Sequence, residues 1–128
     1  MALSAEAKLK SQQDADRRDT ATIRQGAELV KSQIGCTDCH NFHTEDADAT
    51  APHLTGFGSR EWLMGLISNP AGERYFQGRN DRMPAFADQH ILNAQDIGLL
   101  ADWLRGEWYE PPPAMAESAE GRQGRQDH

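Results

Sequence analysis

Long apolar runs are missing from this sequence. No stretch of about 18 or more consecutive apolar residues occurs in the chain, so no segment is expected to cross a membrane as a helix. The first residues, MALSAEAKLKSQQDADRRDT, also lack the apolar centre of a secretory signal peptide. Three explanations stay open: an export signal that has been removed, a chain that is part of a longer protein, or a protein that stays inside the cell.

Basic residues are scarce relative to acidic ones. The chain has 13 Lys and Arg against 20 Asp and Glu, which gives a formal net charge of −7. Residues 20–110 hold most of this excess, with 13 acidic and 7 basic residues. Phosphate would be repelled by such a surface, so nucleic acid is not an expected partner. A basic protein partner, guided by electrostatic steering, is the better expectation.

Apolar residues and cysteines are also few. Apolar residues make up 38% of the 128 residues, and the mean hydropathy is −0.76. A chain of this length is expected to form one small domain with a thin core. Such domains often depend on a disulfide, a metal or a cofactor. The only two cysteines, Cys36 and Cys39, are therefore the first place to look for such support.

The hydrophobic periodicity predicts helices and very little strand, so the expected fold class is all-α. A first helix is predicted from Thr20 to a stop at Gly35. Ser59 is expected to cap a helix over residues 60–68, and Asn93 is expected to cap a last one. A short helical turn is expected near residues 73–76. The inward-facing residues of the first and last helices are expected to be Ile23, Ala27, Val30 and Ile34, and Ile97, Leu100, Ala101, Leu104 and Trp108.

Composition divides the chain into three parts. Residues 1–19 are predicted to be a charged connector, either helical or disordered, and residues 20–110 the folded domain. Three prolines then break regular structure, and residues 111–128 are expected to form a disordered tail. Two irregular loops, 41–58 and 68–92, are long for so small a domain. Loops of that size usually surround a ligand or are disordered.

The stretch CTDCH at residues 36–40 has the pattern C-x-x-C-H, which is typical of covalent haem c attachment. Each thiol adds to one haem vinyl group, and two intervening residues match the separation of the vinyls. The ring of His40 is then placed to become the proximal iron ligand. The expected cofactor is one haem c, held through Cys36 and Cys39.

Three other interpretations of the cysteines stay open. A disulfide between them would close a very short loop and remove little chain entropy. A thioredoxin-like redox pair requires a preceding strand, whereas a helix is predicted there. A zinc site could use Cys36, Cys39, His40 and His43, but tetrahedral sites normally take their second pair of ligands from a distant segment.

The second axial ligand of an electron-transfer haem is predicted to be Met83. This methionine lies in the irregular polar stretch RNDRMPAFA, where no helical stripe explains it, and Pro84 stiffens the chain behind it. Met64 belongs to a predicted helix, where ordinary core packing is expected. His43 is too close to His40 to reach the opposite haem face. His53 and His90 lie on loops and could reach it.

Together these features resemble class I c-type cytochromes over residues 20–110. The resemblance is carried by the first helix with Gly26, and by the stretches GCTDCH, APHLTGFGSREWL, RMPAF and DIGLLADWLRG. It implies a small cytochrome c fold, in which three to four helices surround one haem and Gly26 meets Trp103 where the first and last helices cross. It also implies that the segment at Ala51-Pro52 supplies a backbone carbonyl to the ring of His40. A narrower similarity is to monohaem domains fused to, or associated with, bacterial cytochrome b-type quinol oxidoreductases.

Haem propionates need hydrogen-bond donors when they are buried. Trp62 offers an indole N–H, and several polar residues lie near it in the sequence. The other candidate donors are Arg60, Tyr75, Asn80 and Arg82. Apolar residues expected to contact the haem are Phe57, Leu66, Ile67, Phe76, Phe86, Ile91 and Leu100.

These residues predict a one-electron carrier rather than an enzyme. A haem closed on both faces by His40 and Met83 leaves no coordination position for a substrate, and methionine ligation raises the reduction potential. The resemblance implies a location on the periplasmic side of a bacterial inner membrane, with redox protein partners such as a cytochrome b-type subunit. A five-coordinate haem that binds a gas or reduces peroxide, and a zinc-binding interaction module, are the alternatives.

Overall fold

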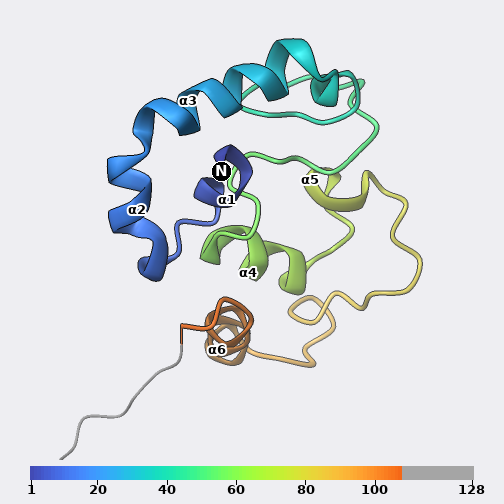
Figure 1. The fold of residues 1–128 in the computed structure, drawn as a ribbon. Helices are drawn as coiled ribbons and strands as arrows, with labels where there is room; N and C mark the ends of the chain where they lie inside the picture. Colours follow the sequence, from blue (N-terminus) through green and yellow to red (C-terminus); the bar gives the residue numbers. More distant parts are fainter. Residues whose placement is uncertain (108–128) are drawn as a thin grey trace, which may run out of the picture.

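The computed structural model describes residues 1–107, which form helices joined by two long loops (Figure 1). Within this range the structure has no strand, and an isolated parallel bridge joins His40 to Ala51. The all-α prediction is therefore confirmed at the level of fold class. No helix in this part of the chain is long and apolar enough to cross a membrane. Trp108 and the predicted tail lie outside the described residues.

The elements in chain order are α1 (Ala2–Glu6), η1 (Lys10–Gln12), α2 (Gln13–Arg18), α3 (Thr20–Glu28), η2 (Leu29–Gln33), η3 (Cys36–Asp38), α4 (Arg60–Ser68), α5 (Glu73–Phe76) and α6 (Ala94–Leu104).

The predicted helix starts are found at the expected residues. The Ser59 hydroxyl accepts a hydrogen bond from the backbone N–H of Trp62 at 3.2 Å, which caps α4. The Asn93 side chain accepts one from the backbone N–H of Asp96 at 2.9 Å, which caps α6. These bonds satisfy N–H groups that have no partner inside their own helix.

The first predicted helix is present, but its last turn is wider than expected. After α3 the chain continues into η2, a π-helical turn in which Ile34 N–H donates to the Leu29 carbonyl. The wider turn rotates the following residue away from the helical stripe. Val30 is buried, whereas Ile34 is 65% exposed, so the prediction that Ile34 faces inward is wrong. Gly35 then turns the chain in a left-handed conformation, φ +73°.

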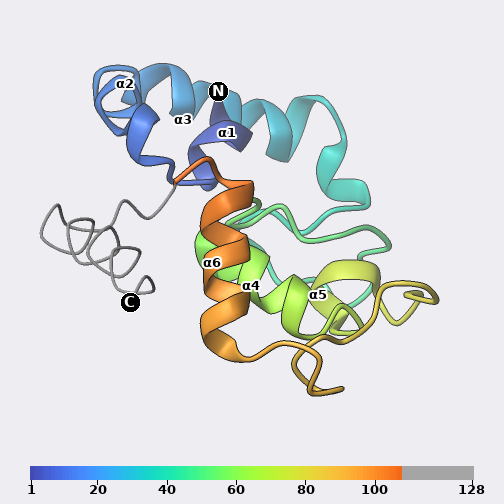
Figure 2. The same ribbon diagram turned by 90° about the horizontal axis from the view of Figure 1, so that it is seen from below.

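Helices α4 and α6 pack against each other and form the larger part of the core (Figure 2). The contact face of α6 consists of Ile97, Gly98 and Ala101, all of them buried. A Cβ at Gly98 would lie 2.7 Å from Nη2 of Arg60 and 3.9 Å from Cε of Met64, so the glycine permits a close approach. Met64 therefore packs in this interface, as predicted.

Two residues predicted to face inward from α6 do not. Leu100 is 39% exposed and Leu104 is 56% exposed. The buried face of α6 is centred on Ile97, Gly98 and Ala101, and Leu100 is roughly a quarter turn away from it. Leu104 is the last residue of the helix.

The N-terminal segment, residues 1–12, is packed against the rest of the fold. Helix α1 lies between α3 and α4 (Figure 1), and Ala2 is buried. A Cβ at Gly26 would lie 3.1 Å from Cβ of Ala2, so α1 occupies the surface that Gly26 leaves open. Gly26 thus packs against Ala2 of α1, whereas the resemblance implied a pairing with Trp103. Of the two alternatives for residues 1–19, the helical one is found.

Arg105 connects this N-terminal segment to two other parts of the chain. Its side chain is 5% exposed, and its Nη1 donates to the carbonyl oxygens of Ala7 at 2.6 Å and Gly58 at 2.8 Å. Its Nη2 donates to the Lys8 carbonyl at 3.2 Å. One buried guanidinium thus joins the N-terminal segment, the end of loop 41–58 and the end of α6.

Replacement of Arg105 should loosen all three segments. We expect Arg105→Ala to lower the free energy of unfolding by about 2–4 kcal/mol, because it removes several charge-assisted bonds and leaves buried carbonyls unpaired. Urea denaturation measures this loss, and hydrogen exchange should show faster exchange in residues 2–12. Arg17→Ala is the matched control, since the Arg17–Asp14 pair is exposed and its loss should change stability by less than about 0.5 kcal/mol. Equal effects of the two substitutions would contradict the connecting role of Arg105.

Candidate functional site

The two cysteines lie on a tight turn that follows the first long helix. The residues Cys36–Asp38 form η3, a short 3-10 turn, and His40 N–H donates to the Cys36 carbonyl at 3.0 Å. The Thr37 hydroxyl donates to the Lys31 carbonyl at 2.9 Å, which ties the turn to η2. Both thiols are free, Cys36 is partly buried and Cys39 is exposed. The turn therefore presents two unpaired thiols, one of them at the surface.

The ring of His40 is held by the loop that follows the motif. Its Nδ1 lies 2.6 Å from the carbonyl oxygen of Pro52. The backbone N–H groups of Thr50 and Ala51 both donate to the Cys39 carbonyl, at 3.0 and 2.9 Å, so this loop runs beside the motif. A carbonyl oxygen can only accept, so Nδ1 carries a proton, and in the neutral ring Nε2 then holds the lone pair. The structure thus brings Pro52 to His40, as the resemblance implied.

Asn41 lies directly after the motif and is not part of any pattern identified in the sequence. It is 2% exposed, and its Nδ2 donates to the Asp46 carbonyl at 2.9 Å while its Oδ1 accepts from the Asp46 N–H at 2.8 Å. Its Nδ2 also lies 2.9 Å from Nε2 of His53. The sequence feature that could have identified Asn41 is its place at the start of a loop rich in Asp and Thr, where side-chain-to-backbone turns are common. Asn41 fixes the loop that carries Pro52.

The other histidines have different surroundings. His43 Nε2 lies 2.6 Å from Oε1 of Glu6, so its ring is held by α1. His53 pairs with Asn41, and His90 is exposed in a left-handed turn. In residues 1–107, no group of three or more His, Cys, Asp or Glu side chains is arranged to hold a metal ion. The alternative zinc ligand set of Cys36, Cys39, His40 and His43 is therefore not assembled in this structure.

Met83 is held by an asparagine three residues earlier. Nδ2 of Asn80 donates to the Met83 carbonyl at 2.8 Å, and Oδ1 of Asn80 accepts from the Met83 N–H at 3.1 Å. Met83 is partly buried. Arg82, beside it, has a 93% exposed side chain that faces Asp81 at 3.8 Å. Asn80 therefore contacts the Met83 backbone, and Arg82 lies on the surface.

Trp62 is at the centre of an aromatic cluster. Its ring centroid lies 4.7 Å from that of Phe57 and 5.2 Å from that of Tyr75. Trp62 is buried, and its Nε1 has no hydrogen-bond partner. A buried donor without an acceptor is costly, so such a group calls for a partner such as a water molecule, an ion or a ligand.

The remaining predicted polar residues occupy other positions. A Cβ at Gly65 would lie 2.0 Å from the Tyr75 hydroxyl, so Tyr75 fills the space beside this glycine. Burial raises the pKa of Tyr75, and the charge of Arg74 partly opposes that shift. Arg60 donates to Asp102 across α4 and α6, at 2.8 and 3.3 Å, and this bond lowers the pKa of Asp102. The structure therefore brings Tyr75 to Trp62 but engages Arg60 elsewhere.

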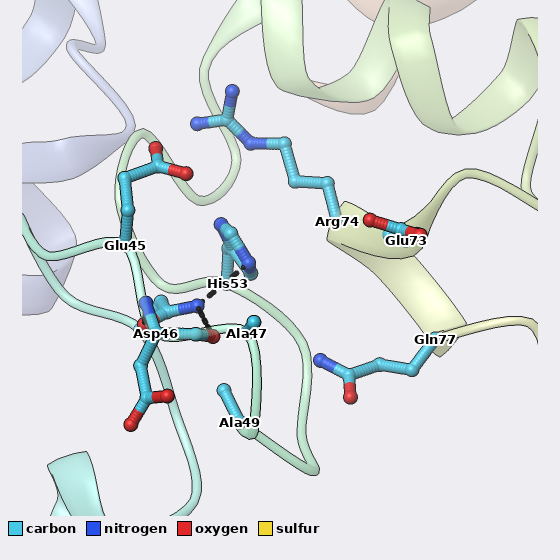
Figure 3. Close-up of a pocket in the computed structure, with 9 residues that line it drawn as sticks. Glu45, Asp46, Ala47, Ala49, His53, Glu73, Arg74 and Gln77 are labelled. Carbon is cyan, nitrogen blue, oxygen red and sulfur yellow. Dashed lines mark hydrogen bonds between the residues drawn. The ribbon is translucent and has the colours of Figure 1, made fainter.

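A polar cavity of about 670 Å³ lies between loop 41–58 and α5 (Figure 3). His53 lies near its centre, with Glu45 and Arg74 on one side and Gln77 on another. The Gln77 side chain donates to the Ala51 carbonyl at 2.8 Å. The residues that line this cavity carry charges of both signs and include neither cysteine nor Met83. This cavity is therefore separate from the residues expected to bind a cofactor.

Comparisons of this chain with models of protein families, with curated protein sequences and with solved structures found no match.

Removal of the Asn41 side chain should disturb the loop that carries Pro52. We expect Asn41→Ala to lower the free energy of unfolding by about 2–3 kcal/mol, because a buried side chain with three hydrogen-bonded contacts is lost. Asn69→Ala is the control, since Asn69 also bonds a backbone N–H, that of Ala71, but at an exposed turn. Thermal or urea denaturation measures the stability of both variants. A loss for Asn41→Ala no larger than that for the control would contradict this role.

Proposed function

We propose that this chain is a monohaem c-type cytochrome domain that transfers single electrons and is not itself an enzyme. The observation that carries the proposal is the position of His40 Nδ1, 2.6 Å from the Pro52 carbonyl, directly behind two free thiols at C-x-x-C spacing. A histidine whose ring is fixed by a second partner, with Nε2 left free, is the arrangement that a metal-bound imidazole needs.

The residues present fit a covalently bound haem. Cys36 and Cys39 would bind its two vinyl groups, and His40 and Met83 would bind its iron. The unpaired indole N–H of Trp62 would donate to a propionate. When bound, the haem supplies a one-electron ferric–ferrous couple.

The protein's own residues hold the haem-binding side chains in position and offer apolar surface that would exclude water from the haem. The turn at Cys36–Asp38 places both sulfurs, the Pro52 carbonyl holds the proton on Nδ1 of His40, and Asn80 holds the Met83 backbone. Several of the apolar residues expected to contact the haem are exposed on the chain by itself and offer it apolar surface. These are Phe57 (45%), Phe76 (40%), Ile91 (51%) and Leu100 (39%).

The partners follow from charge and from the exposure of the attachment turn. Cys39 is exposed, so a partner could approach this edge without entering the domain. The excess of acidic residues favours a basic electron acceptor. The resemblance adds a periplasmic location and a cytochrome b-type membrane subunit as a partner, with electrons passing within or from a quinol-oxidising respiratory complex.

Production in a bacterium that attaches haem c tests the proposal. Intact-mass spectrometry should show the chain mass plus one haem, and a reduced pyridine adduct should report haem c. The double variant that carries both Cys36→Ala and Cys39→Ala should give the bare chain mass. Wild-type protein with only the bare chain mass would overturn the proposal, and stoichiometric zinc in a colourless protein would support the interaction-module alternative.

The role of Met83 as a residue that would bind the haem iron has its own test. Met83→Ala should remove the sulfur-to-iron charge-transfer band of the ferric protein and lower the reduction potential, because thioether ligation favours the ferrous state. An unchanged spectrum would show that another residue binds the iron. Rapid and complete binding of carbon monoxide by the ferrous wild-type protein at neutral pH would favour the five-coordinate alternative.

Trp62→Phe tests the unpaired indole. In the haem-bound protein we expect a loss of about 1.5–3 kcal/mol in unfolding free energy, because a hydrogen bond to a carboxylate is removed while an aromatic ring is kept. The reduction potential should fall, because the propionate charge is then less compensated. An unchanged reduction potential in Trp62→Phe would argue against a propionate contact at Trp62.

A further inference from the structure

We propose that Asn80 is a positioning residue that holds the Met83 thioether at the iron. This inference depends on the proposed function and on Met83 as a ligand. Both polar atoms of the Asn80 side chain bond the backbone of Met83, its N–H at 3.1 Å and its carbonyl at 2.8 Å. From the sequence, Asn80 is a candidate donor to a propionate, whereas in the structure its side chain bonds the Met83 backbone.

The geometry of this contact restrains the residue that carries the sulfur. A primary amide that accepts from N–H and donates to C=O of the same residue acts like a neighbouring strand, so it opposes rotation about both backbone torsions of Met83. Pro84 acts from the other side, because the residue before a proline is restricted to extended conformations. The Met83 backbone is therefore restrained by the Asn80 side chain and by Pro84, the residue that follows it.

The loop around Asn80 is anchored at both ends. At its start, Gln77 donates to the carbonyl of Ala51, the residue whose backbone bridges to His40. At its end, the N–H groups of Phe86 and Ala87 donate to the carbonyls of Ile67 and Ser68, at 3.2 Å each. These carbonyls lie in the last turn of α4, where helical partners are absent. Between the two anchors, the two hydrogen bonds from the Asn80 side chain to the Met83 backbone restrain the path of the chain. We call this pair of bonds the clamp.

A loop methionine that binds iron is in equilibrium with a detached state, and the clamp should oppose detachment. Without the clamp, the backbone of Met83 gains freedom only when the sulfur leaves the iron, since ligation itself restrains it. We therefore expect Asn80→Ala to raise the detached fraction about ten-fold, equivalent to about 1.4 kcal/mol. A propionate donor would instead change the reduction potential without changing detachment.

The experiment compares haem-bound Asn80→Ala, Asn80→Asp and Asn69→Ala with the wild type. Carbon monoxide binding to the ferrous protein reports detachment, and the charge-transfer band of the ferric protein reports sulfur ligation. Asn80→Ala should bind carbon monoxide about ten times faster and have a weaker band. Asn80→Asp keeps the acceptor for the Met83 N–H and should give an intermediate rate. Asn69→Ala removes a similar loop bond, to the N–H of Ala71, and should match the wild type.

The outcomes separate the two proposals. If Met83→Ala loses the band while Asn80→Ala binds carbon monoxide like the wild type, the ligand assignment stands and the clamp is overturned. If Met83→Ala keeps the band, the ligand assignment itself fails. A lower potential in Asn80→Ala with an unchanged rate would also overturn the clamp and restore the propionate role. Circular dichroism confirms folding of each variant, and Asn80→Asp remains decisive if Asn80→Ala does not fold.

Discussion

The hydrogen bond between Nδ1 of His40 and the Pro52 carbonyl is the contact on which the rest of the site depends. It fixes the tautomer of the ring, and it requires loop 41–58 to fold back along the cysteine turn. That path is secured by backbone bonds to the Cys39 carbonyl and by the buried side chain of Asn41. A loop without regular structure thus becomes a fixed support, because hydrogen bonds within the loop, and others from Glu6, Arg74 and Arg105, restrain its backbone.

The two sides of the proposed iron site are mechanically linked. Gln77 bonds the carbonyl of Ala51 beside His40, and Asn80, three residues further on, bonds Met83. A displacement of loop 41–58 would therefore be transmitted to the start of the segment that carries the thioether. The small apolar core explains why polar side chains have this role: buried apolar residues in the described chain are few, and Phe42, Ile97 and Ala101 are among the most deeply buried. Amide-to-backbone bonds are directional and restrain torsions that a thin core cannot.

The N-terminal segment changes the architecture that the resemblance implied. Glu6 accepts from the Gly56 N–H at 2.6 Å and contacts His43, so α1 supports the same loop that carries Pro52. Ala2 covers Gly26, which places α1 where a contact between the first and last long helices was expected. These charged residues were predicted as a connector because their composition is polar. Their packing depends on a few long-range bonds, above all those of Arg105, which composition does not reveal.

The sequence by itself determined the local features: the starts of α4 and α6, the turn at Glu73–Phe76, the all-α class and the spacing of two thiols and an imidazole. Each depends on interactions between residues a few positions apart, which a sequence pattern records directly. Only the tertiary structure decided which faces are covered and which polar groups are paired. Ile34, Leu100 and Leu104 proved exposed, Arg60 joined Asp102, and Asn80 turned to Met83, while the indole of Trp62 was buried without a partner. These outcomes depend on the path of the whole chain, because each side chain pairs with the group that folding brings nearest, however distant that group is in the sequence.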